Sequence, residues 1–417
     1  MYDNIGVRRD KTMIEVKGKY NTATRYTDLI GENAISQIIE MLNQEFTKDL
    51  KVRIMPDCHA GVGCVIGTTM TIKDKVVPNL VGVDIGCGML SVNLGKLEVD
   101  YKALDDFIKE NIPSGMKVNE HIVDHSIDLK KLKCFEYLKK TTYLKKSIGT
   151  LGGGNHFIEI DKDEEDNLYL IIHSGSRNLG TQVAKHYTRA AKMYQQDKIY
   201  NKFEEKQQVI AQYKKEGKSK YIEQKLKEID AKTIHLPIPE SLCYLEGKLF
   251  NDYIHDMDIC QKFAVKNREI IARKIVKFLG KNYDQLEKFE TIHNYINMED
   301  MILRKGAISA YENQKVLIPI NMRDGCIVAI GKGNPDYNYS APHGAGRLLS
   351  RGDAKELIDL EDYQKTMEGI FTTSVNTSTI DESPFAYKPI ESIIENIQDT
   401  VEIVKIIKPV YNYKCCD

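Results

Sequence analysis

Tryptophan, an excess of one charge and long apolar runs are all missing from this 417-residue sequence. The 59 Lys and Arg residues are balanced by 60 Asp and Glu residues, so the formal net charge is −1. A balanced charge gives no overall attraction to nucleic acid or to an acidic membrane, so any polyanion site must be a local basic patch. No run approaches the roughly 20 apolar residues that span a bilayer, and the first residues do not resemble a signal peptide. We therefore expect a cytoplasmic protein with no membrane partner.

Disulfide and common nucleotide-binding patterns are also missing. The nine cysteines are odd in number and scattered, which does not fit a disulfide framework and indicates a reduced protein. Zinc-finger and HExxH spacings, a Walker A loop and a Rossmann glycine fingerprint do not occur. A nucleotide, if one binds, must be held by a different kind of binding site.

Strand-like and helix-like segments are interleaved along the chain. Apolar and β-branched runs predict strands within residues 12–31, 50–100, 154–161, 168–173 and 315–330. Helical spacing predicts helices over residues 101–112, a charged pair within 180–232 that breaks near Gly217, a better-packed stretch over 242–279, and a last helix over 389–404. Strands before and after a helical block predict an α+β fold, with one domain over residues 1–417 and a helical excursion at about 180–285.

A carboxylate and a thiol lie three residues apart in the apolar, strand-like stretch 81–89. Asp84 and Cys87 offer a hard oxygen and a soft sulfur ligand, a combination that favours a borderline transition metal over Mg²⁺ or Ca²⁺. The alternative is a buried aspartate with its hydrogen-bond partners beside an inert core cysteine.

Five of the ten histidines occupy similar positions, near Gly, Asn or Asp at the ends of apolar segments. They are His59, His156, His173, His293 and His343. Each alone is compatible with an ordinary core histidine. If they converge with Asp84 and Cys87, the ligands suffice for two metal ions, which can hold both attacking and leaving oxygens of a phosphoryl transfer.

Arginines follow two of these histidine motifs. Arg177 ends the run His-Ser-Gly-Ser-Arg, and a guanidinium beside small hydroxyl residues suits a phosphate. Arg347 and Arg351 are four residues apart, so on one helix they would share a face and could clamp a phosphate. Small neighbours leave His343 sterically open, as a nucleophile or a metal ligand requires.

Five motifs, in this order, resemble the RtcB-type RNA-splicing ligases. They are Val-Gly-Val-Asp84-Ile-Gly-Cys87-Gly, Gly-Gly-Gly-Asn155-His156-Phe-Ile-Glu159, His173-Ser-Gly-Ser-Arg177, His293-Asn294 and His343-Gly-Ala-Gly-Arg347. The resemblance implies a fold of central stacked β-sheets surrounded by helices. It also implies a ligase that joins RNA 3′-phosphate or 2′,3′-cyclic phosphate ends to 5′-hydroxyl ends, in RNA repair or tRNA splicing.

The resemblance further implies GTP and two Mn²⁺ ions as cofactors. Cys87 would be shared by both ions. Asp84 and His293 would complete one metal site, and His156 and His173 the other. His343 would attack the α-phosphorus of GTP and become guanylylated, and Asp57 would be an acidic residue near the reacting ends.

Nucleotide and RNA positions are implied in the same way. The nucleotide-binding residues would be Asn155, His156, Phe157, Glu159, His293, Asn294, Asn321, Met322, His343, Gly344, Ala345, Gly346, Tyr387 and Lys414. Arg177, Arg347 and Arg351 would contact RNA phosphates. An archease-like activator is a possible partner, and the resemblance favours a monomer.

One loop departs from the family pattern. Where the family usually has Pro-Gly-Ser-Met-Gly, residues 319–323 have Ile320 in place of the Gly and Arg323 in place of the last Gly, and a Ser just beyond is Cys326. This leaves the nucleotide open. Two other functions also stay open, a metal-dependent RNA-end phosphatase or cyclic phosphodiesterase and a non-catalytic RNA-end binder.

Overall fold

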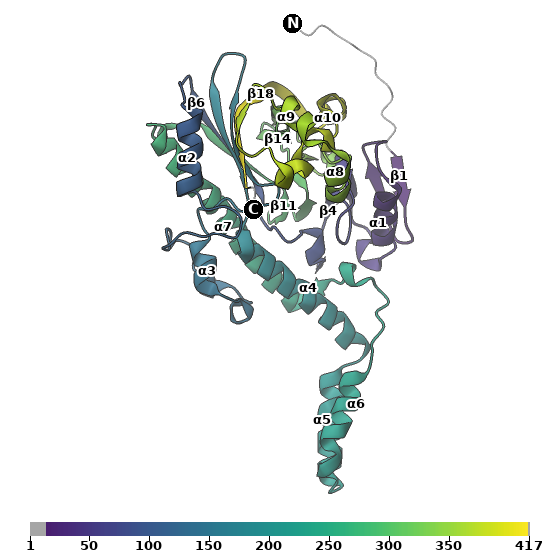
Figure 1. Ribbon diagram of the computed structural model, residues 1–417. Coiled ribbons are helices and arrows are strands. Elements are labelled where there is room, and N and C mark those ends of the chain that lie inside the picture. Colours follow the sequence, from purple (N-terminus) through teal and green to yellow (C-terminus); the bar gives the residue numbers. More distant parts are fainter. Residues whose placement is uncertain (1–13, 416–417) are drawn as a thin grey trace.

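Two β-sheets and the helices packed on them form the fold, which a computed structural model describes for residues 14–415 (Figure 1). The smaller sheet has six strands, antiparallel except for the parallel β2–β3 pair. In spatial order they are β1 (Ile14–Lys17), β2 (Thr22–Arg25), β3 (Val52–His59), β4 (Ile66–Thr71), β12 (Ile302–Lys305) and β11 (Asn294–Asn297).

The larger sheet has eight strands and is nearly closed, because its end strands β10 and β14 lie in contact. In order they are β10 (Lys288–Ile292), β6 (Gly88–Gly95), β8 (Leu168–Ser174), β7 (Phe157–Lys162), β18 (Val401–Lys414), β15 (Gly325–Gly331) and β14 (Lys315–Asn321), with β17 (Phe371–Thr372) beside β18. Two short pairs join β5 (Lys75–Val76) to β9 (Leu245–Glu246) and β13 (Ala307–Ser309) to β16 (Ser340–Pro342).

Ten α-helices surround the sheets in the described part of the chain. They are α1 (Glu32–Leu42), α2 (Tyr101–Asn111), α3 (Thr141–Lys146), α4 (Arg177–Ile199), α5 (Lys202–Lys215), α6 (Ile222–Ala231), α7 (Gly247–Phe278), α8 (Arg351–Leu357), α9 (Leu360–Thr366) and α10 (Ile390–Ile397). The long helix α7 contributes apolar side chains to the cores beneath both sheets. The predicted α+β class is confirmed.

Helices α5 and α6 form a hairpin that projects from the body, at the bottom of Figure 1. Helix α5 has no buried residue, and Ile229 is the one buried residue of α6, so charged and polar side chains face solvent on nearly all sides. The chain breaks twice: Asn201 caps α5 by accepting a hydrogen bond from the backbone N–H of Glu204, and Gly217 turns the chain with φ of +67°. The predicted helical pair is therefore three helices.

Two further sequence predictions are wrong at their boundaries. The helix predicted over residues 389–404 ends at Ile397, and β18 begins at Val401, because the first half of Val401–Lys414 pairs with β15 and its second half pairs with β7. Residues 81–87 form a turn, with positive φ at Gly82 (+96°) and Gly86 (+74°), and strand β6 begins only at Gly88. Within residues 14–415, no helix combines the length and apolarity that a membrane span requires.

Candidate active site

The turn that carries Asp84 and Cys87 lies where the chain passes from the smaller sheet to the larger one. It follows β4 and β5 and leads into β6. The chain returns at His293, the single residue between β10 of the larger sheet and β11 of the smaller one. The two passages are bonded together: the backbone N–H of His293 donates to the Cys87 carbonyl at 2.9 Å, and that of Gly86 donates to the Asn294 carbonyl at 2.8 Å.

One group of possible metal ligands consists of Asp84, Cys87 and His156, whose donor atoms all lie within 4.8 Å of one another. Nε2 of His156 lies 2.9 Å from Asp84 Oδ2 and 3.5 Å from Cys87 Sγ. The other ring nitrogen, Nδ1, lies 2.9 Å from the Leu151 carbonyl oxygen and donates to it. In a neutral ring the Nε2 lone pair therefore points at a carboxylate and a sulfur, an arrangement that a cation between them would stabilise.

A second group shares Cys87 and adds His173 and His293. His173 repeats the pattern of His156, since its Nδ1 donates to the Asn155 carbonyl at 3.1 Å and its Nε2 lies 3.2 Å from Cys87 Sγ. Nδ1 of His293 is buried and has no hydrogen-bond partner among the described residues. Such an orphaned nitrogen fits a metal ligand better than a core histidine.

The electrostatics of this centre favour neutral imidazoles at His173 and His293. Desolvation and the neighbouring imidazoles lower the pKa of His173 and of His293 well below the usual range. Burial raises the pKa of Asp84, but its hydrogen bond and charge interaction with His156 outweigh this and lower it to about 2. Neutral nitrogens, a carboxylate and a shared sulfur suit a divalent transition metal, whose charge would also favour the Cys87 thiolate. The grouping differs from the expected one, because Asp84 lies with His156 and His293 lies with His173.

His343 lies beside the second group, in the segment after β16. Its ring centroid is 4.9 Å from that of His293. Nδ1 of His343 lies 2.7 Å from Oδ2 of the fully buried Asp57 on β3, and the backbone N–H of His343 donates to the same oxygen at 3.1 Å. Gly346 permits this approach, because a Cβ there would lie 2.4 Å from the Asp57 carbonyl oxygen. With Nδ1 bonded to Asp57, Nε2 is the ring nitrogen left for chemistry.

Several predicted nucleotide residues gather at the adjoining ends of β7, β15 and β18. Glu159 is buried, and its carboxylate accepts from Asn412 Nδ2 at 2.7 Å and from Cys326 Sγ at 3.5 Å. Burial raises the pKa of Glu159 to about 7 and raises that of the neighbouring Asp161 well above its usual range. Nζ of Lys414 lies 5.2 Å from the ring centroid of Phe157. The structure thus brings Phe157, Glu159 and Lys414 together.

The divergent loop 319–326 reaches the His343 segment by its backbone. A Cβ at Gly344 would lie 3.2 Å from the Pro319 carbonyl oxygen. Two predicted side chains of the loop are occupied within the protein: Asn321 Nδ2 donates to Asp324 Oδ2 at 2.8 Å, and Met322 is buried, with its sulfur 3.1 Å from the Tyr363 hydroxyl. Their nucleotide contacts stay predictions.

The glycine-rich turn 152–154 and Asn294 have local roles that the structure makes visible. A Cβ at Gly152 would lie 1.7 Å from Nη1 of Arg177, so only glycine admits the guanidinium beneath the turn. Nη2 of Arg177 donates to the Gly115 carbonyl at 2.9 Å, and its Nε donates to Thr150 Oγ1 at 3.1 Å. Asn294 Nδ2 donates to the Asp84 carbonyl at 3.3 Å and thereby supports the metal turn.

The other two predicted arginines do not share a helix face. Arg347 lies in the loop before α8, which begins at Arg351. They meet instead at the carboxylate of Glu382, which is 2.7 Å from Arg351 Nη1 and 3.4 Å from Arg347 Nη1. Glu382 was not predicted, because no local pattern marks it.

Helix α7 supplies two more residues that the sequence reasoning missed. Arg268 is fully buried, and its Nη1 donates to the Gly86 and Ser174 carbonyls at 2.9 Å and 2.6 Å. The neighbouring Asn267 accepts from the backbone N–H groups of Gly149 and Thr150 at 2.7 Å and 3.0 Å. These contacts fix the turns near the ligands. The sequence did not indicate this role, because charged and polar residues are common in any helix.

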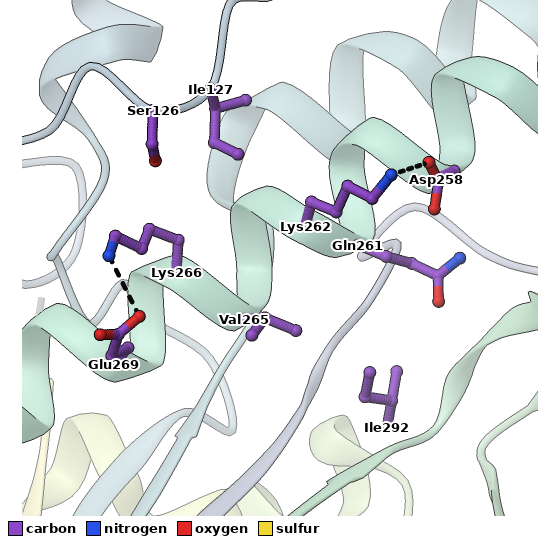
Figure 2. Close-up of a pocket in the computed structure, with 9 residues that line it drawn as sticks. All are labelled: Ser126, Ile127, Asp258, Gln261, Lys262, Val265, Lys266, Glu269 and Ile292. Atoms are coloured by element: carbon purple, nitrogen blue, oxygen red, sulfur yellow. Dashed lines mark hydrogen bonds and ion pairs between the residues drawn. The ribbon is translucent and has the colours of Figure 1, made fainter. Parts of the chain in front are cut away.

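A separate hollow of about 370 Å³ lies along α7 and contains none of the predicted site residues (Figure 2). Its charged side chains pair with each other, Lys262 with Asp258 and Lys266 with Glu269. Their mutual neutralisation leaves no convergent charge for a ligand. The chemistry is concentrated at the junction of the sheets.

Comparisons with known proteins match this chain to one family over most of its length. A family profile described as tRNA-splicing ligase RtcB matches residues 44–138 and 136–415. The RNA-splicing ligase RtcB of Escherichia coli K12 is 28% identical, over 86% of this chain and 88% of that protein. The tRNA-splicing ligases RtcB of Pyrobaculum aerophilum and Nanoarchaeum equitans are 25% and 27% identical, each over 85% of both chains.

Proposed function

This chain belongs to the RtcB family, as its motifs predicted, and we propose that it is an RNA ligase that joins 3′-phosphate or 2′,3′-cyclic phosphate ends to 5′-hydroxyl ends in RNA repair or tRNA splicing. The proposal includes GTP as the energy source and His343 as the residue that carries the guanylate. The observation that carries it is the pairing of His343 Nδ1 with buried Asp57 at 2.7 Å, next to the two ligand groups.

Asp57 prepares His343 for attack. By accepting from Nδ1–H it keeps that proton away from Nε2, whose lone pair is then available to bond to phosphorus. When Nε2 forms that bond the ring becomes cationic, and the Asp57 carboxylate stabilises the charge. Because Asp57 also accepts from the backbone N–H of His343, the ring has little freedom to turn.

Three transfers at phosphorus complete the reaction. Nε2 of His343 bonds to the α-phosphorus of GTP, the bond to the β-phosphate oxygen breaks, and pyrophosphate leaves. An oxygen of the RNA 3′-phosphate then bonds to the guanylate phosphorus, and the phosphorus–nitrogen bond breaks. Finally the RNA 5′-hydroxyl oxygen bonds to the 3′-phosphorus, its proton passes to solvent, and GMP leaves. Water would first open a cyclic end to the 3′-phosphate.

The metal cofactor is proposed to be two Mn²⁺ ions, one at each ligand group, with Cys87 Sγ common to both. Such ions would neutralise the phosphates and favour the ionised form of the entering hydroxyl. Asn155, Phe157, Glu159 and Lys414 are proposed to hold the nucleotide, because the side chain of Asn155 is exposed beside His156 and the other three lie together. Arg177, Arg347 and Arg351 are proposed to bind RNA phosphates.

We further propose that the chain is a single domain acting as a monomer, with an archease-like activator as a possible partner. The single domain is supported by α7, which packs into the cores beneath both sheets, so the helical excursion is anchored to the body.

Labelling with α-³²P-GTP and Mn²⁺ tests the proposal. The wild type should acquire an acid-labile label, His343→Ala should not, and the matched control His186→Ala, half-buried on α4, should label normally. An RNA carrying 3′-phosphate and 5′-hydroxyl ends should then be joined. A label that survives His343→Ala would contradict the guanylylation. Loss of the terminal phosphate without joining would instead indicate a phosphatase, and an RNA-end shift without label or turnover would indicate a binder.

A further inference from the structure

A single buried carboxylate connects residues of the nucleotide side with residues of the RNA side. Glu382 is 3% exposed and lies at the end of a short 3₁₀ turn. Its Oε2 accepts from Lys414 Nζ at 2.7 Å and from the Tyr387 hydroxyl at 2.9 Å. Its Oε1 faces Nη1 of Arg351 at 2.7 Å and Nη1 of Arg347 at 3.4 Å. Oε2 thus faces the nucleotide side and Oε1 the RNA side, and the two sides also touch directly, since Arg347 Nη1 donates to the Tyr387 hydroxyl at 3.2 Å.

The charges around Glu382 keep it ionised. Burial raises its pKa, but the charges of Lys414 and then Arg351 outweigh this and lower the pKa to about 2. A buried carboxylate is costly unless it is paired and hydrogen-bonded, and here hydrogen bonds and ion pairs reach both oxygens. Because charge-assisted hydrogen bonds are short and directional, Glu382 fixes where the partner side chains lie.

The preceding residue has a narrower set of contacts. One carboxylate oxygen of Asp381 pairs with Arg351, and the other lies 3.9 Å from Lys355 Nζ. The Asp381 carbonyl accepts from Nη2 of Arg347. The Asp381 side chain thus pairs with Arg351 and Lys355 and not with Lys414 or Tyr387, which makes Asp381 a matched control for Glu382.

We propose that Glu382 is a positioning residue that holds Lys414 and Tyr387 for the nucleotide and Arg347 and Arg351 for the RNA end at once. It thereby fixes the separation of the two substrates without touching the reacting atoms. This inference rests on the proposed function, since it assigns the two sides of Glu382 to the nucleotide and the RNA.

Binding measurements without turnover test it. Affinities of the full-length protein for GTP, and for an RNA oligonucleotide with a 3′-phosphate, are measured for the wild type, Glu382→Gln, Glu382→Asp and Asp381→Asn. Glu382→Gln keeps the size of the side chain and removes its charge, so both affinities should fall about tenfold or more. Glu382→Asp restores the charge and should recover part of both losses. Asp381→Asn should weaken only the RNA end.

Each outcome decides the matter. If Glu382→Gln weakens one ligand alone or neither, or if Asp381→Asn weakens both equally, the shared role is wrong. If Glu382→Gln binds the RNA end more tightly than the wild type does, Glu382 competes with the RNA phosphate for the arginines. That result would also overturn the shared role. Melting temperatures identify a variant that is merely unstable. General instability would weaken GTP binding as well as RNA binding, also in the Asp381→Asn control. A wild type that binds both ligands but does not ligate refutes the proposed function and leaves this test in force. A wild type that binds neither refutes both.

Discussion

Replacement of Asp57 by Asn isolates the charge behind His343. The backbone N–H of His343 donates to the same Asp57 oxygen that Nδ1 approaches, at 3.1 Å and 2.7 Å. In Asp57→Asn, an amide NH₂ at the position of Oδ2 would face the backbone N–H of His343, which is also a donor. The amide oxygen should therefore occupy the position of Oδ2, and the amide nitrogen that of Oδ1. That position is buried and has no hydrogen-bond partner among the described residues. The tautomer of His343 should survive, and only the charge is lost.

The expected loss of rate follows from two bounds. A hydrogen bond to a charged group contributes about 1 kcal/mol more than a neutral one. Two unit charges about 4 Å apart interact by about 4 kcal/mol at an effective dielectric constant of about 20, which bounds the stabilisation of the cationic ring. Since each 1.36 kcal/mol is tenfold, guanylylation by Asp57→Asn should be between about 5-fold and about 1000-fold slower.

Single-turnover labelling at saturating α-³²P-GTP measures this rate directly. Asp256→Asn is the control, because Asp256 is equally buried but accepts from Tyr187 and from the backbone of residues 133 and 134. Asp57→Asn should bind GTP with wild-type affinity. A wild-type labelling rate in Asp57→Asn, or an equal loss in Asp256→Asn, would refute the assigned role of the carboxylate.

Three other expectations concern the turn, the metals and the buried acid. Gly152→Ala places a methyl 1.7 Å from the Arg177 guanidinium at a φ of +89°, and should cost about 1–3 kcal/mol in a thermal melt, whereas Gly153→Ala, whose nearest neighbour is at 3.7 Å, should not. Cys87→Ala removes the atom common to both ligand groups, so elemental analysis should find less metal at both positions; an unchanged metal content would contradict a shared thiolate. Burial raises the pKa of Glu159 from 4.5 to about 7, so its contribution to stability is complete below pH 4.5 and is lost as the pH rises through 7. In Glu159→Gln the melting temperature should therefore depend less on pH over that range. A pH profile equal to that of the wild type would contradict the raised pKa.

The sequence predicted which residues meet better than it predicted how they meet. Of the seven residues expected to converge, five form the two ligand groups: Asp84, Cys87, His156, His173 and His293. His59 and His343 belong to neither group. Which ligands share a group was not predictable, since that depends on which strand ends approach each other in space.

For three other features the local sequence pattern gave a wrong prediction or none. The last predicted helix ran on to residue 404, but Val401–Lys414 pairs with β15 and β7 and is a strand from its first residue. Arg347 and Arg351 meet at one carboxylate, but through a loop and not through a helix face. Glu382 has partners from separate segments, so nothing near it in the sequence marked its place.

The two passages between the sheets that carry metal ligands limit where the chain can be opened. One ligand of the second group, His293, lies in the return passage, and Asp84 and Cys87 lie in the outward one. New termini in either passage would leave the strands able to pair, but the metal ligands of that passage would no longer be held in place by the chain on both sides. The turn at Gly217, at the tip of the projecting hairpin, is tied to neither passage. It is the natural place for a circular permutation or an inserted reporter domain that leaves the metal centre intact.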